Sequence, residues 1–163
     1  SPHRAALAGS LGLGLQLATM APDDGSGRSF EQLQLDAVTA YREASRESGF
    51  SEGHVMVSRQ MIPVEDDSEL ERYVSLLPRE RAADPAVSAE HRSVEIGGRP
   101  AVFSSVVLDD PATVAQALVS DAVVQQADEI VLVLPFGVPG ADQRRVLETF
   151  GRHVVPHLLS AIV

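Results

Sequence analysis

Cysteine and lysine are both absent from this 163-residue sequence. Without cysteine, the chain has no disulfide framework, no thiolate nucleophile and no cysteine-ligated zinc or iron–sulfur centre. Without lysine, it has neither a Schiff-base lysine nor the lysine of a phosphate-binding P-loop, and all 13 of its basic residues are arginines. These two absences exclude several large enzyme classes.

Basic residues and long apolar runs are also scarce. The 13 basic residues face 23 acidic ones, which gives a net charge of −10 and argues against a nucleic-acid partner, since phosphates attract a basic surface. No apolar run reaches the roughly 18–20 residues of a membrane-spanning helix. Residues 1–4 lead into a short alanine-rich helix and not into a signal peptide. We therefore expect a cytoplasmic protein with neither a nucleic-acid nor a membrane partner.

The order of expected elements is that of an α/β protein. The length suits one domain with its own core, residues 1–163. Apolar spacing, helix caps and proline positions predict helices at 2–10, 29–48, 66–77, 109–126 and 141–161. Pro156 should kink or interrupt the last of them. Strand-like segments are 12–19, 54–64 and 127–137. Strands that alternate with helices predict a parallel sheet.

The third strand-like segment, ADEIVLVLPFG, is aliphatic without a break from Ile130 to Leu134. A strand with one face in water alternates apolar and polar residues, whereas this one does not. The pattern is typical of a strand in a parallel sheet that is covered by helices on both faces. We therefore expect this strand to be buried on both sides.

Four segments of the sequence resemble, in the same order, the motifs of one family of barrel enzymes. SPHRAALAGSLGLGLQLAT resembles the segment that follows the fifth barrel strand, where a serine-containing turn opens a helix. DDPATVAQAL resembles the helix start G-x-P-E-x-V-A-x-x-L, with aspartate in place of glycine. ADEIVLVLPFG resembles the last barrel strand, and RRVLETFGRHVVPHL resembles the terminal helix. By these four segments the sequence resembles the bacterial luciferase-like family of flavin-dependent monooxygenases.

The resemblance implies the fold class of a (β/α)8 TIM barrel, of which this chain would be the C-terminal portion, with about three parallel strands and their helices. Three strands cannot close an eight-stranded cylinder, and open sheet edges favour aggregation. The N-terminal barrel part must then come from another chain or from a cleaved segment. That part is the first expected partner, and we also expect an oligomer.

The activity implied by the family is that of an oxidoreductase, a monooxygenase that uses reduced FMN. A peroxide of the reduced flavin oxygenates a small organic substrate, and a flavin reductase is a candidate partner. A deazaflavin-dependent oxidoreductase that transfers hydride is one alternative. A non-catalytic partner subunit that completes a barrel is another. No residue is assigned as catalytic, because the family's general base comes from earlier strands.

The cofactor-binding residues implied by the resemblance are Ser1, His3, Arg4, Thr19 and Met20. The first three stand at a helix N-terminus, where N–H groups, a hydroxyl and a guanidinium can hold the flavin phosphate. Thr19 and Met20 end a strand and would face the mouth of the barrel. The alternative is that the serine only caps the helix, that the arginine is a surface residue and that the last two are ordinary strand-end residues.

The apolar residues of segment 78–100 show no sustained helical or strand periodicity. We therefore expect this segment to form a lid or an insertion loop. In the family, a mobile loop of this region covers the flavin and excludes water. Its candidate substrate-lid residues are Arg79, Arg81, His91, Arg92 and Arg99. The alternative is a disordered insertion whose charges are solvated.

Metal binding is not expected. His153 and His157 are four residues apart, a spacing that can hold a metal, but no third ligand is evident and Pro156 lies between them. The aspartate pairs at 23–24, 66–67 and 109–110 precede expected helices or lie in turns, so we interpret them as caps and not as general acid–base pairs.

Overall fold

The computed structural model describes residues 1–76 and 93–162, and the chain divides into two compact units. Unit 1 contains the described residues of 1–59, 89–104 and 122–131, and unit 2 contains those of 60–88, 105–121 and 132–163. The expected organisation as a single domain stays a prediction. Among the described helices, none is both long enough and apolar enough to cross a membrane.

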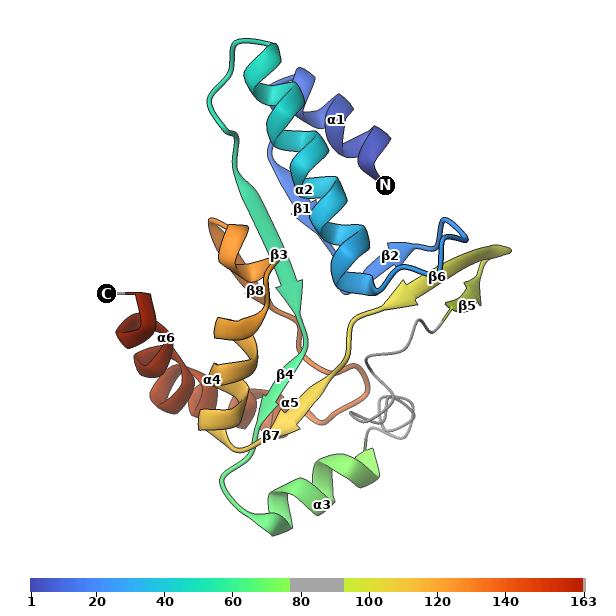
Figure 1. Ribbon diagram of the computed structural model, residues 1–163. Helices are drawn as coiled ribbons and strands as arrows, with labels where there is room; N and C mark the ends of the chain where they lie inside the picture. Colours follow the sequence, from blue (N-terminus) through green and yellow to red (C-terminus); the bar gives the residue numbers. More distant parts are fainter. Residues whose placement is uncertain (77–92, 163) are drawn as a thin grey trace. The chain divides into compact units, whose positions relative to one another are not determined.

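A three-stranded sheet with the order β1-β3-β8 lies in unit 1 (Figure 1). β1 is Leu15–Leu17, β3 is Val55–Arg59, and β8 is Glu129–Leu132, which belongs mostly to this unit. β1 and β3 run in parallel, with Leu15 opposite Val55. The expected α/β class, with parallel strands and helices, is therefore confirmed.

Two helices cover one face of this sheet. α1 (Pro2–Ser10) packs on α2 (Phe30–Glu47). Their apolar sides and the sheet share one core, whose buried members are Ala5, Leu17, Ala37, Val38, Tyr41, Val55, Val57 and Val123. Both helices have the bounds that the spacing of apolar residues predicts, to within a residue or two.

The ends of α2 are set by its own sequence. The Ser29 side chain accepts a hydrogen bond from the N–H of Gln32, and the Gln32 side chain accepts one from the N–H of Ser29, which forms a capping box. Gly49, with a φ of 81°, follows the last turn in the left-handed conformation that ends many helices. The predicted N-cap and stop are confirmed.

Tyr41 ties α2 to the loops that enter two strands. Its hydroxyl donates to the carbonyl of Leu13 at 2.7 Å and accepts from the N–H of His54 at 3.0 Å. Its ring is buried, and Gly53 leaves room for it, since a Cβ at that glycine would lie 2.2 Å from the hydroxyl oxygen. The helix therefore positions the starts of both β1 and β3.

A second, antiparallel sheet in unit 1 has the order β2-β6-β5. β2 is Met20–Pro22, β6 is Arg99–Phe103 and β5 is Ser93–Ile96. The hairpin between β5 and β6 turns at Gly97 and Gly98, both at positive φ. Ala21, Leu33 and Val102 are buried together beneath this sheet.

This hairpin corrects two sequence-based expectations. The expected loop 78–100 is wrong from residue 93 onward, because SVEIGGRPAVF alternates apolar residues around a Gly-Gly turn, which is a hairpin signal. The expected strand 12–19 is also wrong in its bounds. The chain breaks after Leu17 and starts a new strand at Met20, which pairs with Phe103 of the hairpin.

Unit 2 is built around a two-stranded parallel sheet. β4 (Met61–Pro63) pairs with β7 (Val107–Asp109). Helices α3 (Asp67–Leu76), α4 (Pro111–Ser120) and α5 (Gly140–Thr149) belong to the same unit. Its core has the buried members Ile62, Val64, Tyr73, Val138 and Val146. The predicted strand 54–64 is thus two strands, β3 and β4, with Gln60 between them.

Carboxylates on two helices join α3 to α5. Glu69 of α3 forms an ion pair with Arg145, and Arg72 bonds the buried Asp142 at 2.8 Å. The hydroxyl of Tyr73 donates to the carbonyl of Asp142 at 3.0 Å. Both acidic side chains are buried and paired, which is the usual requirement for a charge in a protein interior. These contacts are structural.

The C-terminal helix changes its winding before Pro156. α5 ends at Thr149, a π-helical turn follows at Phe150–Val154, and α6 runs over Val155–Ile162. A proline has no N–H to donate to the preceding turn. The expected interruption at this proline is therefore present, and it takes the form of a wider turn.

Helix α4 is shorter than predicted. The apolar spacing indicates a helix over 109–126, but α4 ends at Ser120 and a short 3₁₀ turn follows at Val124–Gln126. The N–H of Ala122 donates to Glu31 of α2 at 3.0 Å, and Val123 is buried in the core of unit 1. Tertiary contacts to α2 replace the last helical turn.

Strand β8 is not covered on both faces. Glu129 and Ile130 are exposed, with 38% of Ile130 accessible. The prediction of a fully buried strand is therefore wrong for this chain. The strand is at the edge of the sheet among the described residues, so one row of its backbone groups faces no further strand there.

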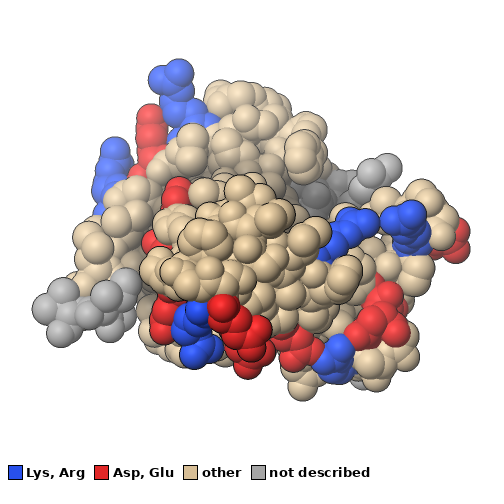
Figure 2. All heavy atoms as spheres, turned by 90° about the horizontal axis from the view of Figure 1, so that it is seen from above, with Lys and Arg blue, Asp and Glu red and all other residues tan. Residues whose placement is uncertain are grey.

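Apolar side chains are also exposed where α1 ends and after α2. About half of the surface of each of four side chains is accessible, those of Leu7, Leu11, Leu13 and Phe50. Figure 2 looks onto this end of the molecule and shows a broad area without charged side chains, bordered by arginines and carboxylates. Large exposed apolar areas mark interaction surfaces more often than chance would give.

Candidate functional site

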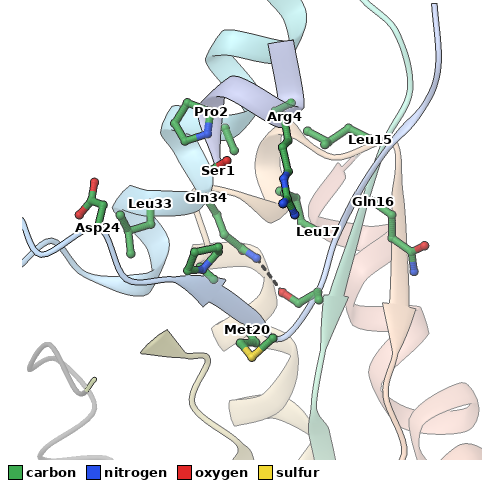
Figure 3. A pocket seen from close by; sticks show the side chains of 15 residues that line it. Ser1, Pro2, Arg4, Leu15, Gln16, Leu17, Met20, Asp24, Leu33 and Gln34 are labelled. Atoms are coloured by element: carbon green, nitrogen blue, oxygen red, sulfur yellow. Dashed lines mark hydrogen bonds between the residues drawn. The ribbon is translucent and has the colours of Figure 1, made fainter. Parts of the chain in front are cut away.

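A pocket of about 280 Å³ lies in unit 1 between the start of α1, the strand β1, the strand β2 and the start of α2 (Figure 3). Leu15, Leu17 and Leu33 supply apolar lining. Its polar groups are fewer and come from four segments: Ser1 and Arg4, Gln16, Asp24, and Gln34. An apolar pocket with a few convergent polar groups is the common form of a ligand site.

The start of α1 makes one end of this pocket positive. Ser1 holds the N-cap position, yet its side chain makes no capping hydrogen bond, so the hydroxyl is not used by the helix. Pro2 has no N–H, and the N–H groups of a first helical turn have no partner within the helix. The Arg4 guanidinium lines the same end of the pocket. These groups can hold an anion.

Gln34 contributes a buried amide to the pocket. The residue is 2% exposed, and its Nε2 donates to the carbonyl of Ala18 at 2.8 Å, as Figure 3 shows. Its Oε1 is buried without a hydrogen-bond partner among the described residues. A buried unpaired acceptor is uncommon in proteins and calls for a donor. A ligand with hydroxyl or N–H groups could supply one.

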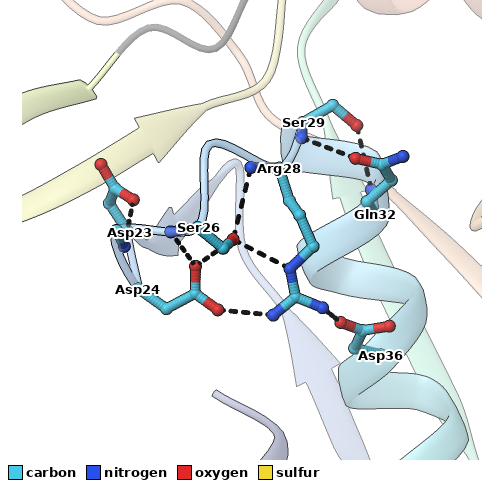
Figure 4. Close-up of polar contacts among 8 residues, drawn as sticks. Asp23, Asp24, Ser26, Arg28, Ser29, Gln32 and Asp36 are labelled. Carbon is cyan, nitrogen blue, oxygen red and sulfur yellow. Dashed lines mark hydrogen bonds and ion pairs between the residues drawn. The ribbon is translucent and has the colours of Figure 1, made fainter.

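The loop between β2 and α2 closes the acidic side of the pocket. Asp24 accepts hydrogen bonds from the N–H and the hydroxyl of Ser26, and Arg28 bridges Asp24 and Asp36 (Figure 4). Gly25 donates its N–H to Asp23. These bonds fix the short loop, which explains this aspartate pair as a structural feature.

The same bonds make the stability of this loop depend on pH. Hydrogen bonds from Ser26, and next from Arg28, hold the pKa of Asp24 well below its usual range. Because the pKa is lowered in the folded state, the contribution of this carboxylate is present above its unfolded pKa of about 3.9. It is lost as the pH falls through the folded value.

We therefore expect Asp24→Asn to unfold at lower urea concentration than the wild type at pH 7, with a difference that shrinks below about pH 4. Urea titrations followed by circular dichroism at pH 7 and at pH 3 measure it. Glu43→Gln is the control, since the Glu43 side chain is exposed and forms no hydrogen bond or ion pair with the described residues, and this variant should match the wild type at pH 7. A difference for Asp24→Asn that is equal at both pH values would contradict the assignment.

The structure brings three of the five expected cofactor residues together. Ser1, Arg4 and Met20 line the pocket. His3 is exposed and does not line it, and Thr19 is half-buried in the link between β1 and β2, where its carbonyl accepts from the N–H of Ser104 at 2.9 Å. Their role in cofactor binding stays a prediction.

Of the expected lid residues, Arg79, Arg81, His91 and Arg92 lie outside the described residues. Arg99 is described and is the first residue of β6, where it is exposed. It therefore stands on a paired strand of a hairpin. The lid stays a prediction.

The residues described hold no cluster of three or more His, Asp or Glu side chains that could bind a metal. Nε2 of His153 lies 3.2 Å from a carboxylate oxygen of Glu65, and His157 is exposed. Asp110 caps α4 through the N–H groups of Ala112 and Thr113, and hydrogen bonds from Thr113 lower its pKa. Capping therefore explains this aspartate, as the sequence predicts.

Gln34 was not among the site residues predicted from the sequence. The sequence does indicate that this side chain is buried. The apolar stripe of the second helix includes positions 30, 33, 37 and 38, and residue 34 lies on that stripe. A glutamine on the buried side of a helix needs partners. The bond to Ala18 was not predictable, since it depends on how the chain leaves β1.

No model of a protein family matches this sequence, and no curated protein is significantly similar to it. Solved structures do resemble it. The monooxygenase RslO1 from Streptomyces bottropensis aligns with a TM-score of 0.67 and 18% identity, over 96% of this chain and 45% of that chain. 

A second similar structure is the oxygenating constituent of 3,6-diketocamphane monooxygenase, a type II Baeyer–Villiger monooxygenase from the CAM plasmid of Pseudomonas putida, in complex with FMN. It aligns with a TM-score of 0.57 and 16% identity, over 94% of this chain and 45% of that chain. The chain thus spans less than half the length of either protein. The likeness shows a common fold with part of each.

Proposed function

We propose that this chain is the C-terminal part of a luciferase-like, flavin-dependent monooxygenase that oxygenates an organic substrate. The observation that carries the proposal is the pocket of unit 1, where Ser1 and Arg4 meet Met20 beside the carboxyl end of β1. Ligand sites of parallel α/β folds lie at that end of the strands. The likeness to two monooxygenases, one of them solved with FMN, supports the same class.

The residues of the pocket fit one end of FMN. The phosphate would lie at the start of α1, where the Arg4 guanidinium, the Ser1 hydroxyl and the first-turn N–H groups converge. The unpaired Oε1 of Gln34 suits a hydroxyl of the ribityl chain. A volume of about 280 Å³ is just below the roughly 300–1,000 Å³ of complete ligand pockets, so this pocket would hold only part of the cofactor.

Bound reduced flavin supplies the reaction with oxygen, and the described residues supply binding and orientation. Arg4 and Ser1 would fix the phosphate and Gln34 the ribityl chain, which places the remainder of the cofactor outside the pocket. Leu17 and Leu33 would exclude water from its inner wall. None of the pocket residues is assigned a proton-transfer step, because the rest of the barrel would contribute that part of the site.

The test is the binding of FMN to Arg4→Gln, measured by fluorescence titration. A charged hydrogen bond contributes about 1.5–3 kcal/mol, so FMN affinity should fall about tenfold or more. Riboflavin, which lacks the phosphate, should bind the variant and the wild type equally. Arg46→Gln, on the last turn of α2, is the matched control and should leave FMN affinity unchanged.

An equal loss of affinity for FMN and riboflavin would contradict the assignment of Arg4 to the phosphate. Absence of FMN binding by the wild type would contradict the proposal for this chain by itself. In that case a non-catalytic subunit that completes a barrel is favoured, and the exposed Ile130 on an edge strand supports that alternative. Native and denatured mass spectrometry with an absorbance scan over the flavin bands would then look for a second chain.

A further inference from the structure

The pocket of unit 1 carries charges of opposite sign on its two sides. Among the described residues that line it, Arg4 and Asp24 have the charged side chains. Figure 3 shows Arg4 on one side and Asp24 beside Leu33 on the other. A carboxylate repels other anions, so a pocket that only had to attract them would gain nothing from this aspartate. Asp24 therefore limits which anions the pocket can hold.

The Asp24 carboxylate is fixed in place and ionised at neutral pH. It accepts hydrogen bonds from the N–H of Ser26 at 3.0 Å and from the Ser26 hydroxyl at 2.5 Å, and Arg28 pairs with it (Figure 4). The bonds from Ser26, and next from Arg28, hold its pKa well below the usual range. Arg28 also pairs with Asp36. Two carboxylates thus share one guanidinium, and this group keeps a net negative charge.

The other polar groups of the pocket suit a single phosphate on a hydroxylated chain. The Ser1 hydroxyl, the Arg4 guanidinium and the first-turn N–H groups of α1 can hold the phosphate oxygens. The buried, unpaired Oε1 of Gln34 calls for a neutral donor such as a hydroxyl. A second anionic group beside the phosphate would find no second arginine among the described lining residues, and Asp24 would repel it.

We propose that Asp24 determines the specificity of this pocket, which binds a phosphate monoester and rejects a ligand with a second anionic group beside the phosphate. The inference rests on the proposed function for the place of the phosphate, and it narrows the class of cofactor. FMN ends in a phosphate monoester, whereas FAD continues through a diphosphate. The pocket therefore selects FMN over FAD, and over any deazaflavin that carries further acidic groups beside its phosphate.

The test uses inorganic phosphate and pyrophosphate, so it does not depend on flavin binding. A site that is only positive binds pyrophosphate more tightly, because attraction grows with the charge of the ligand. NMR titrations at pH 7 and low ionic strength follow the amide signals of His3 and Arg4 in the first turn of α1. We expect the wild type to bind pyrophosphate no more tightly than phosphate.

Two variants should change this ratio of affinities in opposite directions. Asp24→Asn keeps an oxygen for the bonds from Ser26 but removes the charge, so the affinity for pyrophosphate relative to phosphate should rise about two- to fivefold, as for other exposed charges. Arg28→Gln leaves the carboxylate without its guanidinium, so the same ratio should fall. Disruption of the loop alone would move both variants in the same direction.

Glu43→Gln is the matched control for net charge. It also removes one carboxylate, but Glu43 lies toward the C-terminal end of α2 and does not line the pocket. Its ratio of affinities should equal that of the wild type. Fluorescence titrations of the same four proteins with FMN and FAD then extend the test to the cofactor, and Asp24→Asn should improve the binding of FAD relative to FMN.

The two proposals can fail separately. If the anion ratios follow the variants but the wild type binds neither flavin, the role of Asp24 holds and the proposed function is wrong for this chain. If FMN binds but Asp24→Asn leaves both ratios unchanged, the role of Asp24 is wrong. A wild type that prefers pyrophosphate, or one whose His3 and Arg4 signals respond to neither anion, would also overturn it.

Discussion

Gly9→Ala is expected to lower the free energy of unfolding by about 1–3 kcal/mol, because α1 and α2 touch at this glycine. A Cβ at Gly9 would lie 2.3 Å from the carbonyl oxygen of Tyr41 and 3.0 Å from the backbone nitrogen of Ser45. These are backbone atoms of α2, so they cannot move without separating the helices. Alanine gains about 1 kcal/mol over glycine in an isolated helix, which is less than the expected cost.

Urea unfolding followed by circular dichroism measures this change. Gly140→Ala is the matched control, since a Cβ at Gly140 meets no atom within 4 Å and its φ is not positive. The control should be neutral or slightly stabilising. If Gly9→Ala is as stable as the control, α1 does not pack on α2 as closely as the structure indicates, and the start of α1 is not fixed beside β1.

Leu118→Ala is expected to have the largest effect, a loss of about 2–5 kcal/mol. Leu118 is 0% exposed on α4, the helix of unit 2 that packs against the π-helical turn and α6. Removing its branched side chain loses buried apolar surface and leaves a cavity. The loss would be a large share of the 5–15 kcal/mol of a typical domain.

Leu147→Ala on α5 makes the same chemical change at a side chain that is 49% exposed. It should cost well under 1 kcal/mol. Both variants are compared with the wild type by urea and thermal unfolding. Equal small effects would show that α4 is not packed as described. Equal large effects would show that Leu147 is covered in solution.

Local signals predicted the helices of this fold better than its sheets. The capping box at Ser29 and the cap at Asp110 are complete within a few residues of sequence, so the starts of α2 and α4 follow from them. The short strands β2 and β7 are only three residues long and pair with distant segments. Their existence depends on pairing and not on a local pattern.

The candidate site was predicted in part for the same reason. A helix N-terminus with a serine and an arginine is visible in the sequence, and the structure places Ser1 and Arg4 in one pocket. Gln34 of α2 and Asp24 of the loop after β2 line that pocket because of how the chain turns between β1 and β2, which no local pattern fixes. The apolar run that begins at Ile130 correctly indicates a strand. The same run also predicts that both faces of the strand are covered, but it does not say which part of a protein covers them.

The π-helical turn has a consequence for how sequences of this kind are compared. An α-helix advances about 100° per residue, and a π turn accommodates one extra residue in the same rise. A helical wheel drawn continuously through 141–161 therefore misplaces α6 by about one residue, and an alignment without a gap shifts its buried face. Deletion of one residue at Gly151 would restore a regular helix and leave Leu158 on the same side relative to Val146. The wide turn thus absorbs one residue and keeps the same side of the C-terminal helix packed on α4.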